Sequence, residues 1–379
     1  MKPSRHAASN QTRRSSATRF SSHRLRLLAC SLSLAAPAVS ADTPGSPWWE
    51  QVSVEGDLRL RYESIRKDPG EDIERERYRG RFGFNANLGD SLEFGVRFAT
   101  GDGDPASNNL NFGESISFDN IRVDRAYVGW SASDRFQLTV GKMKNPFFRS
   151  GDTPLMWDSD VNPEGLAAKF ESGVFFGSIG GFQLDYRDDG VESWLYAAQA
   201  GAGFDIAGAS TVTAGIGWFD YTDIAGRAPL YGGNARGNSL DAGGNYLNDY
   251  DILELFAEYE TKVGRWAVVA FVEWTHNTRA AAADTAYSVG VNVGNAAEPG
   301  TAEWSWEWRD TEADALIGVL TDSDLADGRT DSRGHALKGA YRLTNYMSIG
   351  ATLIFSEYGG FNASPTDFDR VMLDVEFDF

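Results

Sequence analysis

The chain has 379 residues, with 54 Asp and Glu against 35 Lys and Arg, a single Cys and a formal net charge of -19. The negative balance excludes a nucleic-acid-binding protein, because that class neutralises phosphates with cations. No stretch reaches the ~18–20 apolar residues of a spanning helix, which excludes a helical membrane protein. The 41 Gly and the aromatic content of 13% on so acidic a chain need another structural explanation.

The first 41 residues have the pattern of an exported protein. Seven Lys and Arg and no acidic residue lie in this segment, and an apolar run follows at 27–38. The run ends on Val39-Ser40-Ala41, which are small residues at the positions that a signal peptidase reads. We therefore predict a cleaved signal peptide over 1–41 and one mature domain over 42–379. A downstream start codon and lipid attachment at Cys30 are alternatives.

After Trp49 the sequence alternates between apolar and polar residues with a period of two. In the first segment Leu58 and Leu60 share one parity, whereas Arg59 and Arg61 share the other. Soluble strands average about 5–6 residues. The alternating segments here run to roughly 10–13 residues, the length that crosses a bilayer at a tilt near 45°. The predicted fold class is all-β, a transmembrane antiparallel up-and-down β-barrel.

About sixteen strands are expected, or 14 or 18 if the weakest segments, 165–171 and 285–293, are assigned differently. In chain order the predicted strands are 51–62, 77–88, 92–100, 119–131, 135–144, 165–171, 174–187, 192–206, 210–222, 250–262, 265–278, 285–293, 301–316, 333–343, 345–357 and 369–379. Short turns alternate with long polar loops between them, as in the barrels of the bacterial outer membrane. An even strand number returns both ends of the chain to the periplasmic side.

The last predicted strand ends on an alternating aromatic pattern. Phe377 and Phe379 lie on its apolar parity, with charged residues on the other. This ending resembles the signal that the barrel-assembly machinery reads, so Phe379 is the predicted assembly signal. Three alternating tryptophans, Trp304, Trp306 and Trp308, are expected to face lipid or a subunit contact.

A barrel of about sixteen strands is too wide for side chains to fill, so its interior is predicted to hold water. The first three strands place six arginines on the inner parity. They are Arg59, Arg61, Arg77, Arg79, Arg81 and Arg97. In the expected hairpin register Arg59 lies opposite Arg79, Arg61 opposite Arg77, and Arg81 opposite Asp57. Like charges across a ladder are unfavourable, so a negative partner is expected nearby.

The loop after the fifth strand, residues 145–165, is the expected partner of these arginines. Its acids are Asp152, Asp158, Asp160 and Glu164. Folded inward, the loop would set an acidic edge opposite a basic wall and create a transverse field across a narrow constriction. In the alternative interpretation the arginines solvate the wall and pair with acids of the first loop, which are Glu71, Asp72, Glu74 and Glu76.

Several sequence blocks resemble one known family. They read RAYVGW at 125–130, LTVGKMKNPF at 138–147, WDSDVNPEG at 157–165 and ADALIGVL at 313–320. In this order, and with the terminal Phe, they resemble Gram-negative outer-membrane porins of the putative-porin group, related to phosphate-selective porins, over essentially all of 48–379. The resemblance implies an outer-membrane location, contact with membrane lipid, passive diffusion of small hydrophilic solutes and ions, and often a homotrimer. The excess of acidic over basic residues does not fit a preference for phosphate.

The predicted mature domain shows neither a catalytic nor a metal-binding motif. Its only histidines are His276 and His335, and no His, Asp or Glu cluster has zinc spacing. We therefore predict no enzyme activity, no cofactor and no nucleic-acid partner. Calcium at the loops is an alternative, and its candidate ligands are Asp102, Asp104, Asp322, Asp324 and Asp327.

The sequence predicts a general diffusion porin of the outer membrane. One alternative is a substrate-selective porin whose arginine row binds anions such as phosphate or organic acids. Another is a barrel enzyme or an adhesin that uses the long loops.

Overall fold

The computed structural model describes residues 51–113, 119–186, 190–206, 208–361 and 364–379, so the predicted signal peptide lies outside the described residues. The strands in chain order are β1 (Val52–Asp68), β2 (Ile73–Leu88), β3 (Leu92–Thr100), β4 (Leu110–Asn111), β5 (Ile121–Ser133), β6 (Phe136–Lys142), β7 (Glu164–Ser172), β8 (Phe175–Asp185), β9 (Ser193–Asp205), β10 (Thr211–Thr222), β11 (Tyr250–Val263), β12 (Trp266–Asn277), β13 (Thr285–Gly294), β14 (Ala302–Thr311), β15 (Ser332–Thr344), β16 (Met347–Tyr358) and β17 (Thr366–Asp378). Short 3-10 turns lie in the loops: η2 (Ser150–Asp152), η3 (Leu230–Gly232), η4 (Gly318–Leu320) and η5 (Leu325–Asp327). None of the helices in the described ranges is long and apolar enough to cross a membrane.

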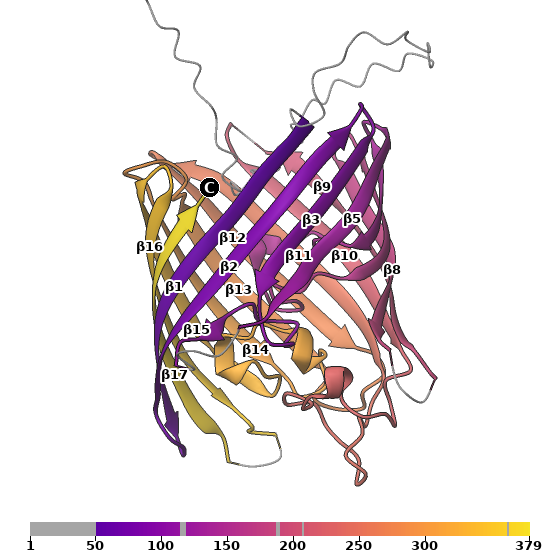
Figure 1. The fold of residues 1–379 in the computed structure, drawn as a ribbon. Helices are drawn as coiled ribbons and strands as arrows, with labels where there is room; N and C mark the ends of the chain where they lie inside the picture. Colours follow the sequence, from indigo (N-terminus) through magenta and orange to yellow (C-terminus); the bar gives the residue numbers. More distant parts are fainter. Residues whose placement is uncertain (1–50, 114–118, 187–189, 207, 362–363) are drawn as a thin grey trace, which may run out of the picture.

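The strands form one antiparallel sheet that closes into a barrel, because β1 pairs with both β2 and β17 (Figure 1). Apart from β4, a two-residue piece beside β2, the described residues contain sixteen long strands. This confirms the predicted barrel, including the two weakest segments, which are β7 and β13. The predicted strand 301–316 was too long: β14 ends at Thr311, because the following residues turn inward and bury Ala313 and Leu316.

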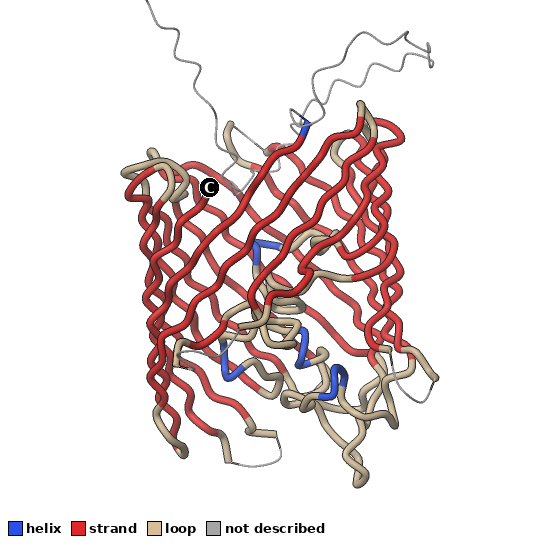
Figure 2. Tube along the Cα trace, viewed as in Figure 1, coloured by secondary structure: helices blue, strands red, loops and turns tan. Residues whose placement is uncertain are grey.

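Both ends of the barrel chain lie at the same end of the cylinder, where the connections are short (Figure 1). The final residue continues the sheet: Gly56 N–H donates to Phe379 O at 3.0 Å, and Phe379 N–H donates to Gly56 O at 3.1 Å. The long loops lie at the opposite end, and Figure 2 shows several of them folded into the barrel. We call these two ends the turn end and the loop end.

The alternation in the sequence separates an outer and an inner face. Outward side chains such as Leu60 and Phe82 are 39% and 40% exposed, whereas inward Arg61 and Arg79 are each 6% exposed. Trp304, also exposed, lies on the outer parity as expected. An apolar outer face is the surface that a lipid bilayer requires.

The interior is not uniformly polar, which differs from the expectation that water lines the whole inner parity. Inward side chains of β8 to β11 form an apolar cluster with the loops that fold inward. Its wall members include Phe182, Leu195, Phe219 and Ile252, and its loop members include Leu155, Trp157, Tyr246 and Leu316. Long loops inside a barrel must bury their own apolar side chains, and this core fills the β8–β11 side of the interior at the loop end.

Candidate pore constriction

Residues 143–163, between β6 and β7, fold into the barrel and are called the inward loop. Residues of β9 and β11 in the barrel wall form hydrogen bonds with the tip of this loop. Gln199 Oε1 accepts from Phe148 N–H at 2.7 Å, and Gln199 Nε2 donates to Phe148 O at 3.0 Å. Ser150 donates to Ala257 O, and Gly151 N–H donates to Glu258, both at 2.9 Å. The barrel wall thereby supplies hydrogen-bond partners for backbone groups of the loop that pair with no strand.

Gly151 is required at the tip of this loop. Its φ is +58°, a conformation that L side chains rarely adopt. A Cβ at this position would also collide with the Phe271 ring of β12. Any larger residue would therefore push the loop away from the wall and change the width of the interior.

The six predicted arginines lie on β1, β2 and β3, and the β1–β2 register is the predicted one. Arg59 lies opposite Arg79, Arg61 opposite Arg77, and Asp57 opposite Arg81. This part of the sequence prediction is confirmed.

Their negative partners come mainly from the barrel wall and not from the inward loop. Arg79 Nη2 lies 2.8 Å from both Asp57 and Glu376, and Arg61 Nε lies 2.8 Å from Asp374. Also on β2, Arg81 pairs with Asp57 and Arg77 lies 3.7 Å from Glu63, while Arg97 on β3 pairs with Asp124. Among the described residues, no ion pair joins these arginines to Glu71, Asp72, Glu74 or Glu76, the first-loop acids of the alternative interpretation.

Two acids of the inward loop, Asp158 and Asp160, are largely buried by contacts with neighbouring segments. Asp160 is 7% exposed, lies 3.5 Å from Arg81 and accepts Asn108 N–H at 3.1 Å. Burial raises the pKa of Asp160, but Arg79 and Arg81 outweigh this effect and hold it below its usual value. Asp158 is also 7% exposed and accepts Ser323 N–H at 2.9 Å. Burial, with Asp160 and Asp322 as neighbours, raises the pKa of Asp158 to about 8.

The other two predicted acids have different positions. The Asp152 side chain is 57% exposed and lies 3.9 Å from Arg149. Glu164 does not belong to the loop: it begins β7 and shares its parity with the outward Leu166. The alternation of β7 explains this difference, since an inward residue begins only at Gly165.

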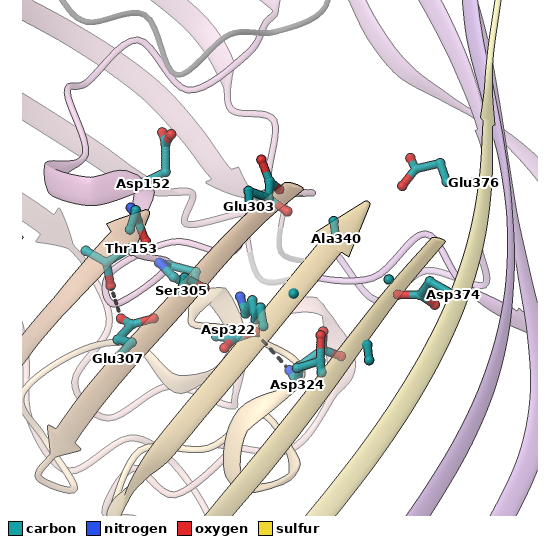
Figure 3. A pocket seen from close by; sticks show the side chains of 18 of the residues that line it. Asp152, Thr153, Glu303, Ser305, Glu307, Asp322, Asp324, Ala340, Asp374 and Glu376 are labelled. Atoms are coloured by element: carbon teal, nitrogen blue, oxygen red, sulfur yellow. Dashed lines mark hydrogen bonds between the residues drawn. The ribbon is translucent and has the colours of Figure 1, made fainter. Parts of the chain in front are cut away.

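A cavity of about 550 Å³ lies on the side of the interior that the apolar core leaves free. Its charged lining comes from β1, β2, β14, β15, β17, the inward loop and the loop 312–331. Those side chains are Arg59, Arg61, Arg79, Lys144, Arg149, Lys338, Asp152, Asp158, Asp160, Glu303, Glu307, Asp322, Asp324, Asp374 and Glu376. Figure 3 shows carboxylates on both sides of the open space, with Asp152 and Glu303 across from Asp374 and Glu376.

Most of these charges neutralise one another, and a few do not. Within the described part of the chain, no ion pair is formed by five of the lining residues, which are Arg59, Lys144, Lys338, Asp158 and Glu303. Arg59 donates to Asn109 Oδ1 at 2.6 Å instead. The inward loop thus contributes an unpaired cation, Lys144, to the same cavity as its exposed acid Asp152.

Sequence reasoning missed the contribution of two further loops. Asn109 reaches the cavity from the segment 101–113, and Asp322 and Asp324 reach it from the loop 312–331, which we call loop seven. Loop seven binds the inward loop directly, since Asp158 N–H donates to Leu320 O at 2.8 Å. The alternation of the last strand predicts that Asp374 and Glu376 face inward. Their partners on β1 and β2 follow only from closure of the barrel.

Four of the five loop acids considered for calcium bind side-chain cations, and the fifth, Asp102, accepts the Asp104 N–H at 3.4 Å. Asp104 lies 3.0 Å from Arg236, and Asp327 lies 3.1 Å from Lys67. Asp322 pairs with Arg309, and Asp324 pairs with Arg61 and Arg370. In the described ranges no three His, Cys, Asp or Glu residues form a group that could hold a metal ion.

The two histidines of the predicted mature domain lie on the outer parity near the loop end. His276 stacks on Trp274 and lies 3.3 Å from Asp284, while His335 accepts Trp306 Nε1–H at 3.2 Å. Neither lines the cavity.

Residues 66–241, from β1 to the loop before β11, match the model of a family described as putative porin. Over these residues the chain is similar to putative porins. A relation to phosphate-selective porins does not follow from this match. No curated protein sequence matches the chain.

Solved porin structures share the fold of this porin at low identity. OprB of Pseudomonas putida is 12% identical, with a TM-score of 0.60, over 87% of this chain and 94% of that chain. OmpF of Salmonella typhi, solved with daunomycin, is also 12% identical, with a TM-score of 0.55 and coverages of 86% and 97%. OmpT of Vibrio cholerae is 14% identical, with a TM-score of 0.51 and coverages of 87% and 100%. Together with the family match, the closed barrel supports an outer-membrane channel.

Proposed function

We propose that this porin lets small hydrophilic solutes and ions diffuse passively across the outer membrane. The observation that carries the proposal is the polar cavity inside the closed barrel, lined by charged side chains on the side that the apolar core leaves free. A path lined by this many charged side chains favours hydrated solutes. Its lining from three inward-folded loops supports a narrow constriction in place of a wide channel.

The ion pairs of the wall favour general diffusion over selective anion binding. The selective alternative needs a row of free arginines, whereas Arg79 and Arg81 share Asp57 and Arg61 binds Asp374. Arginines that are already neutralised attract a passing anion less strongly. Enzyme and adhesin alternatives gain no support from the cavity lining.

Swelling of liposomes in neutral sugars tests the proposal. Reconstituted porin should admit small sugars at rates that fall steeply with solute size and do not saturate with concentration. Saturation at low concentration would support a selective channel, and no swelling with any sugar would contradict diffusion. The variant Arg79→Ala with Arg81→Ala should change the rates for charged solutes without creating or abolishing saturation.

We infer that the porin assembles as a homotrimer through the wall around β6 and β7. These strands are short, and Lys142 lies opposite Glu164 in their ladder. Both share their parity with exposed outward residues, Val140 and Leu166. Charged outward residues are costly against lipid, so a neighbouring subunit is the more favourable environment. Cross-linking of the purified porin tests this; Lys142→Glu should weaken the trimer, and a monomer in every detergent would contradict it.

We also infer that residues 1–41 are a signal peptide and that Phe379 directs barrel assembly. The basic start, the apolar run and the small residues before Asp42 support the first inference. N-terminal sequencing of membrane-extracted protein should begin at Asp42. Phe379→Ala should lower the amount of assembled barrel without changing the conductance of the channels that do assemble.

A further inference from the structure

Asp324 of loop seven lies between two arginines of the barrel wall. Its carboxylate is 3.1 Å from Arg370 Nη1 on β17 and 3.5 Å from Arg61 Nη1 on β1. Arg370 Nη1 also donates to the backbone oxygen of Asp324 at 2.6 Å. Three elements far apart in sequence therefore meet at one carboxylate, which lines the cavity.

The wall alone supplies too few acids for the arginines around this point. Arg61 binds Asp374, while Arg370 shares Glu63 with Arg75 and Arg77. Four guanidinium groups thus share two wall carboxylates, and Asp324 brings a third. Arg61 and Arg370 are only 6% and 3% exposed, so water screens their charges weakly. Arg61 Nη1 is buried and has no hydrogen-bond partner.

Asp324 carries a negative charge in this place at any ordinary pH. Burial raises the pKa of its carboxyl group, but Arg61 and Arg370 outweigh this effect and hold the pKa well below its usual value. The group therefore acts as a permanent anion that is attached to the chain.

The backbone after Asp324 is strained, which indicates that contacts hold this segment in position. Ala326 and Asp327 have φ values of +51° and +62° and precede Gly328 at +68°. The left-handed conformation is unfavourable for a residue that carries a Cβ. Such strain persists where surrounding contacts enforce it, and it clusters at functional segments. Here the contacts include the ion pair of Asp327 with Lys67 at 3.1 Å.

We propose that Asp324 is a tethered counter-ion that occupies an anion site formed by Arg61 and Arg370 and so determines the ion selectivity of the channel. Without it, the two arginines bind small oxyanions from solution, such as inorganic phosphate. The inference rests on the proposed function, because it requires a conducting channel. It makes Asp324 a selectivity-determining residue that acts by keeping solution anions away from the wall.

Single-channel recording with inorganic phosphate as the probe tests this inference. Asp324→Asn should become sensitive to block by phosphate at roughly millimolar concentration, at least about tenfold below the concentration that affects the wild type. Asp324→Ser, prepared in parallel, removes the same charge with a smaller side chain and should show the same block. Asp324→Glu keeps the charge and should behave as the wild type.

Glu303→Gln is the matched control. This substitution removes one negative charge from the same cavity. Because Glu303 has no ion pair among the described residues, the substitution leaves no arginine without a carboxylate partner. It should shift the reversal potential modestly toward anions without phosphate block. Adding Arg370→Gln to Asp324→Asn should remove the block, because the site then loses one of its two cations.

The inference is overturned if Asp324→Asn and Asp324→Ser are no more sensitive to phosphate than Glu303→Gln. That result leaves the proposed function intact as long as the wild type conducts. A wild type without conductance would instead overturn the proposed function, and the inference with it.

Discussion

Arg59 and Arg79 lie directly opposite each other in the β1–β2 ladder, yet only Arg79 has carboxylate partners. Arg79 binds Asp57 and Glu376, whereas Arg59 donates to the amide oxygen of Asn109. Two adjacent arginines on one face thus have different roles. Arg79 stabilises the wall, and Arg59 offers its charge to the cavity.

Substitution of each arginine should separate these roles. Arg59→Gln should shift the reversal potential in a salt gradient toward cations and change the unfolding free energy by less than about 1 kcal/mol. Arg79→Gln removes the charge-assisted hydrogen bonds to Asp57 and Glu376 and should cost roughly 2–3 kcal/mol. Urea unfolding and bilayer recording on both variants check this. Equal loss of stability in the two variants would contradict the assignment.

Asp158 should make the stability of the porin depend on pH. Its pKa of about 8 exceeds the ordinary value near 3.8, so the folded state binds more protons than the unfolded state between these values. The unfolding free energy should therefore fall as pH rises through this window, by at most about 1.4 kcal/mol per pH unit. Unfolding midpoints at pH 5 and pH 8.5 measure the effect. The Asp158→Asn variant should lose the corresponding part of the slope, and an unchanged slope would count against this assignment.

The tip of the inward loop should control the conductance. Gly151→Ala introduces a Cβ against the Phe271 ring at a left-handed position and should displace the loop. The single-channel conductance should then differ from that of the wild type. Gly244→Ala is the matched control, because Gly244 is also left-handed (φ +80°) but has open space where the Cβ would lie. If both variants conduct as the wild type does, the loop does not set the width of the path.

A charged substitution should lower the unfolding free energy more on the outer face of the barrel than on the inner face. Leu353 lies in the middle of β16 and is 40% exposed on the outer parity. Leu353→Arg should cost about 2–4 kcal/mol, the range for a cation facing lipid near the midplane. Ser348→Arg on the same strand faces the cavity and should cost less than about 1 kcal/mol. Refolding into liposomes from urea measures both values, and the reverse order would contradict the assigned faces.

The period-two pattern was enough to predict the barrel, its strand number and the Arg59–Arg79 register. Each of these depends on local alternation and on a short turn, so the information lies within one hairpin. The partners of the arginines were not predictable in the same way. Asp374 meets Arg61 only because the last strand closes on the first, and Asp158 meets Ser323 across 165 residues of chain.

The inner apolar core was missed for a related reason. Phe219 and Leu195 have the inward parity that is polar in β1 and β2, but nothing local shows that loops would cover them. Likewise, Glu164 was assigned to the inward loop because a strand start cannot be placed to one residue from sequence.

The central claim is that the closed barrel encloses a continuous water path across a membrane. Single-channel recording of the purified porin in a planar lipid bilayer tests it most directly. We expect discrete insertion steps with a linear current–voltage relation and a conductance that rises in proportion to salt concentration. Insertion without any step in conductance would contradict the account.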